Sequence, residues 1–364
     1  MDDAVSFVIY DKVDAFRRLV VAKSSSTTLL RNEVSFTEFL LDADHPALPE
    51  ATAPGARCGF RFRGREWFRG RVAATPGHGP VGETTIRVEG DVRKLWDWHG
   101  RPVPSAAVTA QDEEYARYSG PTETIAKAAM TANFARLGVA WSVAPDLGRG
   151  ASARMEFRFH PLADKIVPLL DAADLILELA YVDDAVIVDV REAVLVAGVL
   201  SDLTGKLEAY SWTRDAPTAT RVIVGGRGEG VDREFFEKVN GDLESEWGDI
   251  IESFVDARNT EEGSSLEPDA DEALAAGGPT AGVSMDLIET DAFRFAQHFL
   301  VGDRVRVKVG PLDQLEAITQ VRIDDNPDGV VVTPKLGTAD DDPDVQLGRQ
   351  VALLARGARD EKRR

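Results

Sequence analysis

Residues 221–233 read R-V-I-V-G-G-R-G-E-G-V-D-R, a β-branched strand pattern that runs into a block of glycines and then into a short helical pattern. A strand, a glycine loop and a helix together can bind phosphate, because free backbone N–H groups at a helix N-terminus attract anions. The spacing excludes that interpretation. A dinucleotide-binding motif that starts at Gly226 needs its third glycine where Val231 stands, and no Lys follows the glycines as in a P-loop.

Charge also opposes an anion site in this stretch, because Glu229 would place a carboxylate among the phosphate oxygens. We therefore expect the glycines to serve backbone geometry, as a bulge or a turn with positive φ. These structural glycines are Gly225, Gly226, Gly228 and Gly230.

The composition is that of an acidic globular protein. The 364 residues include 62 acidic and 42 basic ones, which gives a net charge of -20, with 43% hydrophobic residues. This length can hold two to four modest domains. The charge argues against stable binding of nucleic acid, which needs clustered Lys and Arg. The bias toward Arg over Lys fits either GC-rich coding or salt adaptation, and composition does not separate the two.

The cysteine and hydropathy patterns exclude further classes. A single cysteine, Cys58, rules out internal disulfides and Cys-based zinc sites, and we expect it to be a buried apolar residue. No run approaches the roughly 18 apolar residues of a membrane-spanning helix. The N-terminus lacks the basic start of a secretory signal, so we expect a soluble protein made in a cytoplasm.

The first hundred residues are predicted to form a β-domain, a barrel or a sandwich. Short aromatic or β-branched stretches alternate with turns, at residues 5–10, 19–22, 34–41, 60–62, 67–72 and 84–89.

A basic hairpin is predicted inside this domain, with its turn at Gly64 and an apolar face from Phe60, Phe62 and Trp67. On an acidic protein such a hairpin could contact an acidic partner surface, and a solvated strand face is the alternative. Its basic residues are Arg57, Arg61, Arg63, Arg65, Arg69 and Arg71.

Residues 101–196 are predicted to form an α/β domain. A helix should begin after Pro121 and end at Gly138, because Pro suits the first helical turn and Gly suits the left-handed C-terminal position. A second helical pattern follows His160 and contains Pro168, which should kink or end it. Two alternating stretches, 175–182 and 186–194, predict a β-hairpin.

Residues 197–337 are predicted to form a second β-domain with an acidic helical insertion around 242–280. Its expected helix covers 269–276. Residues 338–364 are predicted to be a linker, a short amphipathic helix over 345–354 and a basic tail. The strands of this domain are predicted at 207–213, 220–224, 301–309, 315–323 and 330–334.

No catalytic, cofactor-binding or metal-binding residue stands out. The five histidines show no metal-binding spacing, and the nucleophile-elbow pattern around Ser284 ends in Asp286 instead of Gly. The stretch from Asp324 to Gly329 starts like a calcium loop, but Lys335 stands where that loop needs Glu, so a tight β-turn is favoured. Nothing singles out a carboxylate pair for glycoside hydrolysis among 62 acids.

The glycine block with its flanks is followed by a Glu-Trp-Gly element and then by an Asp-x-Arg. These motifs in order resemble those of siphophage minor tail proteins of the baseplate hub, or tail-tip hub, family, and the resemblance implies that the Glu-Trp-Gly element is a strand. The resemblance extends from the early β-domain to about Gly337. The matching residues include 8–11, Trp96, 207–212, 216–226, 228–233, 246–248, 256–258, 272–274 and 302–303.

The resemblance implies an α+β, mostly β fold with two tail-tube-like β-barrel domains and an inserted α/β domain. It implies a homotrimer at the tip of a long non-contractile tail, which would match the sixfold tail tube to threefold tip components. Distal tail protein, tape-measure protein and tail fibre or tip proteins would be its partners, and DNA would pass through its channel. A virion protein of this kind would be neither an enzyme nor a cofactor carrier.

Charge and glycine geometry add hypotheses about contacts between subunits. The acidic stretch 242–291 would line the channel or face the hairpin arginines Arg61, Arg63, Arg65 and Arg69 of a neighbour. The glycine block would let a barrel strand bend at a subunit contact, with Glu229 and Arg233 paired across it. A hub of a contractile injection system or prophage tail stays open as an alternative. A carbohydrate-binding or cell-wall-acting β-protein is a more distant one.

Overall fold

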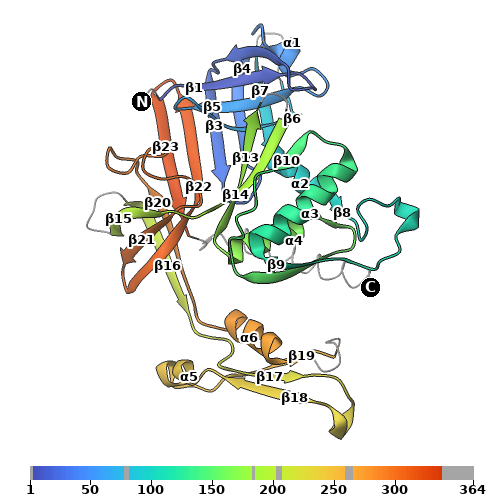
Figure 1. The fold of residues 1–364 in the computed structure, drawn as a ribbon. Helices are drawn as coiled ribbons and strands as arrows, with labels where there is room; N and C mark the ends of the chain where they lie inside the picture. Colours follow the sequence, from blue (N-terminus) through green and yellow to red (C-terminus); the bar gives the residue numbers. More distant parts are fainter. Residues whose placement is uncertain (1–2, 78–81, 183–184, 202–206, 259–264, 338–364) are drawn as a thin grey trace. The chain divides into compact units, whose positions relative to one another are not determined.

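The computed structural model describes residues 3–77, 82–182, 185–201, 207–258 and 265–337, and these divide into two compact units (Figure 1). Unit 1 comprises Met1–Ala209 and Met285–Gly337, and the segment Tyr210–Ser284 belongs to unit 2, which we call the lobe. The domain boundaries predicted at 100 and 196 both fall inside unit 1 and remain a prediction. The helix and basic tail predicted after residue 337 lie outside the described residues.

Unit 1 is built on a 13-stranded sheet to which both ends of the chain contribute. The N-terminal strands are β1 (Val5–Tyr10), β2 (Phe16–Val20), β3 (Ser24–Leu30), β4 (Phe36–Asp42), β5 (Arg57–Phe62), β6 (Arg65–Ala74) and β7 (Glu83–Gly90). The later strands are β15 (Leu195–Ser201), β16 (Leu207–Asp215), β20 (Thr280–Leu287), β21 (Arg304–Val309), β22 (Leu312–Asn326) and β23 (Gly329–Leu336), of which β16 and β20 extend past the unit boundary into residues of the lobe.

The described strands follow an open order, β16-β20-β23-β22-β3-β4-β7-β6-β5-β1-β2, with β15 and β21 attached beside β22. Strand β3 connects the N-terminal strands of the sheet to the later ones, because it pairs with β22 from Leu30↔Gln320 to Ser25↔Asp325. Sequence patterns missed β3, whose Ser and Thr residues lack an apolar alternation. Its Thr27 is buried, and the hydroxyl oxygens of Thr27 and Thr37 are 2.6 Å apart across β3 and β4.

The core of the sheet follows the alternation seen in the sequence. Phe7, Phe39 and Phe60 are almost fully buried, and the rings of Phe7 and Phe39 stack with centroids 4.0 Å apart. Cys58 is a free buried residue, as predicted. The mostly β, α+β fold class is confirmed. Two closed barrels are not seen among the described strands, since the order has free ends at β16 and β2.

The middle of the chain adds two helices and small sheets to unit 1. The longer helix, α3 (Thr122–Leu137), begins directly after Pro121 and ends at Gly138, whose φ of 63° is left-handed, as predicted. Short helical turns are α1 (Leu48–Ala51), η1 (Asp91–Arg93), α2 (Lys94–Asp97) and η2 (Val108–Ala110). The strands here are β8 (His99–Gly100), β9 (Ala116–Pro121), β10 (Trp141–Val143), β11 (Ser152–Phe157), β12 (His160–Pro161), β13 (Leu175–Val182) and β14 (Ala185–Glu192).

The second helix, α4 (Leu162–Ala172), continues through Pro168, so of the two predicted effects, a kink or an end of the helix, the end was wrong. Its buried face is formed by Leu162, Ile166 and Leu170, all fully buried. Pro168 lies on the exposed face, where water can satisfy the carbonyl that the missing N–H leaves free. Burial of three large aliphatic side chains therefore outweighs the lost hydrogen bond.

A buried carboxylate fastens the start of α3 to the segment that precedes β11. Glu123 is fully buried and accepts hydrogen bonds from the backbone N–H of Arg149 at 2.9 Å and from its guanidinium at 2.8 Å. Lys127, one turn later on α3, lies 2.7 Å from the same carboxylate. These donors, Arg149 above all, hold the pKa of Glu123 well below its usual range despite burial.

We expect Glu123→Gln to lower the free energy of unfolding by about 3 kcal/mol at pH 7. Because the pKa of Glu123 is depressed in the folded state, this contribution is present above the ordinary pKa of the carboxyl and is lost as the pH falls below it. Urea unfolding at pH 7 and pH 3.5 should show a smaller difference in unfolding free energy between wild type and variant at the lower pH. The matched control is Glu156→Gln, since Glu156 pairs with Arg117 on the surface.

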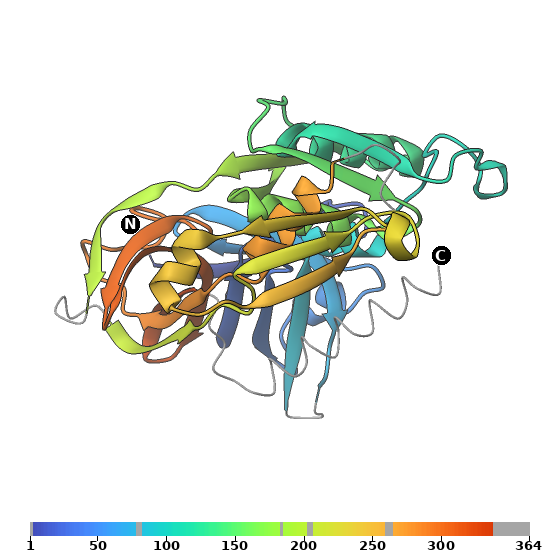
Figure 2. The ribbon, with the colours of Figure 1, turned by 90° about the horizontal axis from the view of Figure 1, so that it is seen from below.

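The lobe is a small α+β unit with its own three-stranded sheet, ordered β18-β17-β19. Figure 2 shows the three strands side by side. They are β17 (Arg221–Gly225), β18 (Phe235–Val239) and β19 (Glu252–Asp256), and the helices are α5 (Gly241–Trp247) and α6 (Glu267–Ala276). Helix α6 packs on one face of the sheet, where Leu266 and Ala270 meet Val222 and Val224.

Two helices of the lobe can be compared with the sequence-based predictions: α5 stands where a strand was expected, and α6 stands where a helix was expected. The Glu-Trp-Gly motif ends helix α5 and is not a strand. Asn240 caps the start of this helix through a 3.1 Å bond from the Leu243 N–H, and Gly248 ends it with a φ of 67°. The acidic helix predicted over 269–276 is confirmed as α6, which begins two residues earlier. No helix in the described ranges is long and apolar enough to cross a membrane.

Candidate interaction sites

The glycine block forms the turn of a hairpin between β17 and β18, instead of a bend within one barrel strand. The two strands pair up to Gly225↔Phe235. Beyond that pair, the Gly226 N–H donates to the Glu234 carbonyl at 2.9 Å, and the Glu234 N–H donates to the Arg227 carbonyl at 3.0 Å. The short helical pattern of the sequence is a single 3₁₀ turn, η4 (Gly230–Asp232). A hairpin turn has no helix N-terminus to bind phosphate.

Gly228 is the glycine that this turn requires most strictly. Its φ is +100°, which side chains disfavour, and a Cβ there would lie 2.4 Å from the Asp232 carbonyl oxygen and 2.8 Å from the Arg233 Cα. Both obstacles are backbone atoms, so neither can move without opening the hairpin. Gly230 also has a positive φ, of +57°, but a Cβ there would meet open space.

Gly225 is required for a different reason, because the Arg233 side chain packs directly against its Cα, where a side chain would otherwise stand. A Cβ at Gly225 would be 2.5 Å from an Arg233 guanidinium nitrogen. That guanidinium donates to the Gly225 carbonyl at 2.8 Å and to the Gly226 carbonyl at 3.0 Å. It also forms a 2.6 Å ion pair with Asp256 on β19. One arginine thus links all three strands of the lobe.

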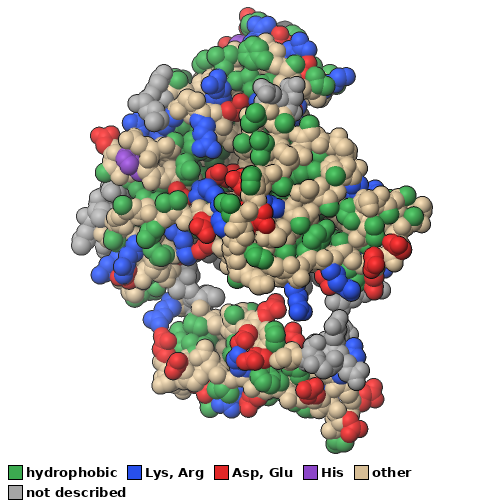
Figure 3. Space-filling view, in the orientation of Figure 1, with side chains coloured by type: hydrophobic (Ala, Val, Ile, Leu, Met, Phe, Trp, Pro, Cys, Tyr) green, Lys and Arg blue, Asp and Glu red, His purple; other side chains and the backbone are tan. Residues whose placement is uncertain are grey.

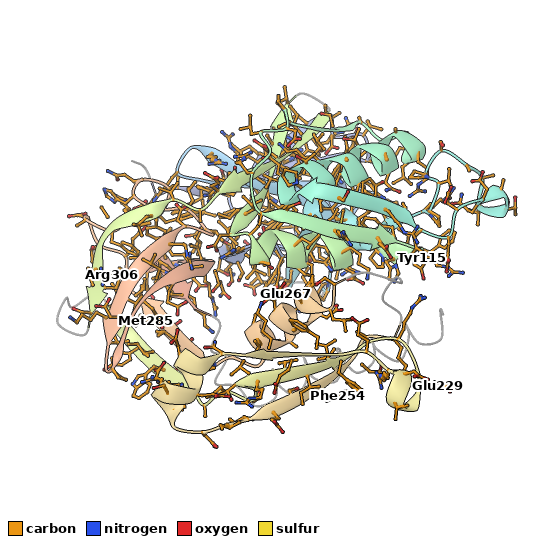
Figure 4. The ribbon with its side chains drawn as sticks, turned by 60° about the horizontal axis from the view of Figure 1, so that its bottom comes forward. Tyr115, Glu229, Phe254, Glu267, Met285 and Arg306 are labelled. Atoms are coloured by element: carbon orange, nitrogen blue, oxygen red, sulfur yellow. The ribbon has the colours of Figure 1, made fainter. Side chains whose placement is uncertain are left out.

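The predicted pairing of Glu229 with Arg233 across a subunit contact remains a prediction, and within the chain Arg233 already has another partner. The carboxylate that Arg233 contacts is Asp256. Glu229 is exposed at the hairpin tip, and Figure 4 shows it there, at the far end of the sheet from α5. A contact of Glu229 with another subunit remains a prediction.

The basic hairpin predicted at Gly64 is the β5–β6 hairpin, whose turn residues Arg63 and Gly64 both have positive φ. Its arginines do not form one basic face. Arg57, Arg63 and Arg69 are buried, whereas the sequence predicted either a contact surface or a solvated strand face for them. Arg57 is paired with Asp14 and Asp91.

Arg63 connects three distant parts of unit 1. Its guanidinium contacts both oxygens of Glu289 at 2.6 Å and the Phe295 carbonyl at 2.7 Å. It also contacts Asp3 at 2.7 Å, and Arg294 binds the same Asp3 carboxylate. The side chain of Arg63 is 1% exposed. Glu289 is 226 residues away in the chain, so no local pattern could have identified it as the partner.

Arg69 lies between two tyrosine rings, with its guanidinium carbon 3.9 Å from the Tyr10 centroid and 4.8 Å from that of Tyr181. It donates to Glu66 at 2.9 Å and to the Tyr10 hydroxyl at 3.0 Å. Burial, with the Glu66 carboxylate beside it, raises the pKa of Tyr10 to about 12. Because Tyr181 belongs to β13, this cluster joins the β5–β6 hairpin to the helical part of unit 1.

Of the four hairpin arginines predicted to contact another subunit, Arg61 and Arg65 are the two that are accessible enough to do so. Arg65 is exposed and lies over the Trp67 ring at 4.6 Å, and Arg61 is half-buried. Arg63 and Arg69 already have carboxylate partners inside unit 1. The interface role itself stays a prediction.

The described residues contain no group of three His, Cys, Asp or Glu side chains that could hold a metal ion. The calcium-like stretch is the turn between β22 and β23, which pair up to Asn326↔Gly329. The turn that the sequence predicted there is confirmed.

Similar folds occur among solved tail proteins. The 43 kDa tail protein of prophage MuSo2 from Shewanella oneidensis matches with a TM-score of 0.57 at 14% identity, over 91% of this chain and 98% of that one. Prophage tail protein gp18 from Listeria monocytogenes EGD-e matches with a TM-score of 0.59 at 12% identity, over 96% and 99%. A tail protein from Neisseria meningitidis MC58 gives 0.54 at 12%, over 92% and 97%.

At such low identity these similarities show the fold alone, and that fold is the one found in phage and prophage tail proteins. The chain belongs to the family described as Siphovirus ReqiPepy6 Gp37-like protein, whose family model matches residues 9–338. The relationship to siphophage tail proteins predicted from the motifs is confirmed. None of the curated proteins matches the chain by sequence.

Proposed function

We propose that this chain is the structural hub at the tip of a long non-contractile tail, where it forms part of the baseplate. The observation that carries the proposal is the full-length similarity to prophage tail proteins, up to 98–99% of the other chain, together with the family match. The role is structural and not catalytic. The protein would act as a component of the virion tail.

The finer parts of the proposal concern assembly. Three copies would form a ring in which two tail-tube-like β-domains per copy face the sixfold tube and threefold tip components attach below. Distal tail protein, tape-measure protein and tail fibre or tip proteins would be its neighbours. The net charge of -20 supports a channel that DNA crosses without binding, since phosphates are repelled by acidic walls.

The test is the mass and symmetry of the purified chain. Size-exclusion chromatography with light scattering is expected to give three times the chain mass, and negative-stain electron microscopy is expected to show threefold rings. A monomer that also stays monomeric with the distal tail protein would contradict the trimer. Immunogold labelling of intact tails should place the chain at the tip, and labelling along the tube would contradict that position.

A hub of a contractile injection system is the second candidate. A chain of the Francisella PdpA–VgrG complex matches with a TM-score of 0.51 at 10% identity, over 92% of this chain and 58% of that one. Tails that carry this protein would then have a sheath in electron micrographs. A carbohydrate-binding or cell-wall-acting protein is the remaining alternative, and binding of the purified chain to cell walls would favour it.

A further inference from the structure

In the part of the chain that the structure describes, one face of the lobe sheet carries exposed apolar side chains. Successive side chains of a strand point to opposite faces, and α6 covers the face that carries Val222 and Val224. The other face carries Ile223 with Phe235, Val239 and Phe254 from the two neighbouring strands, according to the register of the sheet. In Figure 4, Glu267 of α6 and Phe254 lie on opposite sides of the sheet. We call this apolar surface the open face.

The open face exposes large apolar side chains side by side. Phe235 is 57% exposed, Phe254 is 54% exposed and Val239 is 43% exposed. Scattered apolar residues on a surface need no explanation, but these lie on adjacent strands of one small sheet. Aromatic side chains of this kind are the residues that most often anchor protein interfaces.

Arg233 holds the two phenylalanines in place before any partner binds. Its guanidinium carbon is 5.6 Å from the Phe235 centroid and 5.5 Å from the Phe254 centroid. Hydrogen bonds to two carbonyls and the ion pair with Asp256 fix the guanidinium in turn. A preorganised aromatic surface loses little side-chain entropy on binding, which favours a contact.

The charge of the lobe indicates what the open face can accept. Residues 210–284 include 17 acidic and six basic residues, so the lobe carries more than half of the net charge of the chain. Acidic side chains spread over the lobe are visible in red in Figure 3. Glu237 and Glu252 lie on the open face itself, beside Ile223 and Arg221 in the register. Two such lobes would repel each other, whereas a basic surface would be attracted.

We propose that the open face of the lobe docks a protein of different sequence whose contact surface is apolar at its centre and basic at its rim. The proposal goes beyond the hub role, because it needs neither a trimer nor a channel. It names the lobe as a partner-binding module and Phe235 and Phe254 as its anchors.

The first experiment compares the free chain with assembled tails by hydroxyl-radical footprinting. Oxidation of Phe235 and Phe254 is expected to fall at least about fivefold in tails, as for the desolvated centre of an interface. Val231 serves as the internal reference, since it is fully exposed in the 3₁₀ turn η4, outside the three strands of the sheet. Unchanged oxidation of both phenylalanines in tails would overturn the proposal.

The second experiment identifies the occupant. A photo-crosslinking amino acid at position 254, expressed during tail assembly, is expected to capture a different chain through a segment of net positive charge. Capture of this same chain, or of a segment without basic residues, would overturn the proposal. A trimer that forms normally while the crosslink contradicts the proposal would leave the hub role intact, so the two failures are distinguishable.

Variants complete the test. The double variant Phe235→Ser and Phe254→Ser is expected to enter tails about tenfold less than wild type, and Val231→Ser is expected to enter normally. Hydrogen exchange of the purified double variant checks that the lobe is still folded. If the lobe has unfolded, Glu252→Lys takes its place, because that side chain is exposed and its charge reversal should also lower incorporation. Normal incorporation of a folded variant would overturn the proposal.

Discussion

Replacing Arg63 by Gln is expected to lower the free energy of unfolding by about 3–5 kcal/mol, the usual result of removing one member of a buried ion pair. The cost arises because the Glu289 carboxylate would stay largely buried without its ion-pair partner. Glu289 has a side chain that is 15% exposed, and it would lose both guanidinium contacts. The Phe295 carbonyl would lose its donor as well. Urea unfolding at pH 7 measures the change.

Two controls separate this network from other effects. Arg63 has a φ of 52°, so Arg63→Gly relieves backbone strain while it removes the same contacts. It should still destabilise the chain clearly. Arg65→Gln, on the exposed side of the same turn, should cost no more than about 1 kcal/mol. If Arg63→Gly were as stable as wild type, the network would contribute no more than the backbone strain that the glycine relieves.

Replacing Gly228 by Val is expected to open the β17–β18 hairpin and to destabilise the lobe by about 3–5 kcal/mol, the sum of positive-φ strain and overpacking against backbone. The clash with the Asp232 carbonyl cannot be relieved by a side-chain rotation. Hydrogen exchange should show lost protection of amides in β17, β18 and β19, with unit 1 unchanged. Limited proteolysis should cut the variant between residues 226 and 234.

The matched control is Gly230→Ala in the same loop, where a Cβ meets open space. It should cost only about 1–2 kcal/mol, from the left-handed conformation. Equal protection of the lobe in Gly228→Val and wild type would show that the hairpin tolerates a side chain there. In the proposed trimer, the comparison of these two variants also tests whether the hairpin is needed for assembly.

Local patterns predicted much of the secondary structure. Pro121 and Gly138 bound helix α3 as expected, and the Asn326 to Gly329 turn follows from its residue types. The failures have local causes too. Pro168 lies on the exposed side of α4, which the sequence pattern does not reveal. The Glu-Trp-Gly motif was expected to be a strand, whereas Asn240 and Gly248 bound a short helix there.

For the candidate sites too, the sequence predicted some features and missed others. The sequence identified the glycine block and the arginine hairpin as unusual, and both are tight turns, because turns need particular residue types. It did not identify the environment of each arginine. Arg63 forms an ion pair with Glu289, and Arg233 forms one with Asp256. Both carboxylates come much later in the chain than the arginines that they contact. Charge counting cannot distinguish such internal pairs from a contact surface.

The sequence by itself determined the acidic composition, the mostly β pattern, the turn positions and the relationship to siphophage tail proteins, because these depend on residue types and their local spacing. Only the tertiary structure decided that β3 and β22 share one sheet, that Arg63 and Arg69 are internal, and that Phe235 and Phe254 are exposed on one face of the lobe sheet. The physical reason is the range of the interactions. Strand pairing, burial and ion pairing join residues that lie far apart in the chain, and they form only when the whole fold brings those residues together.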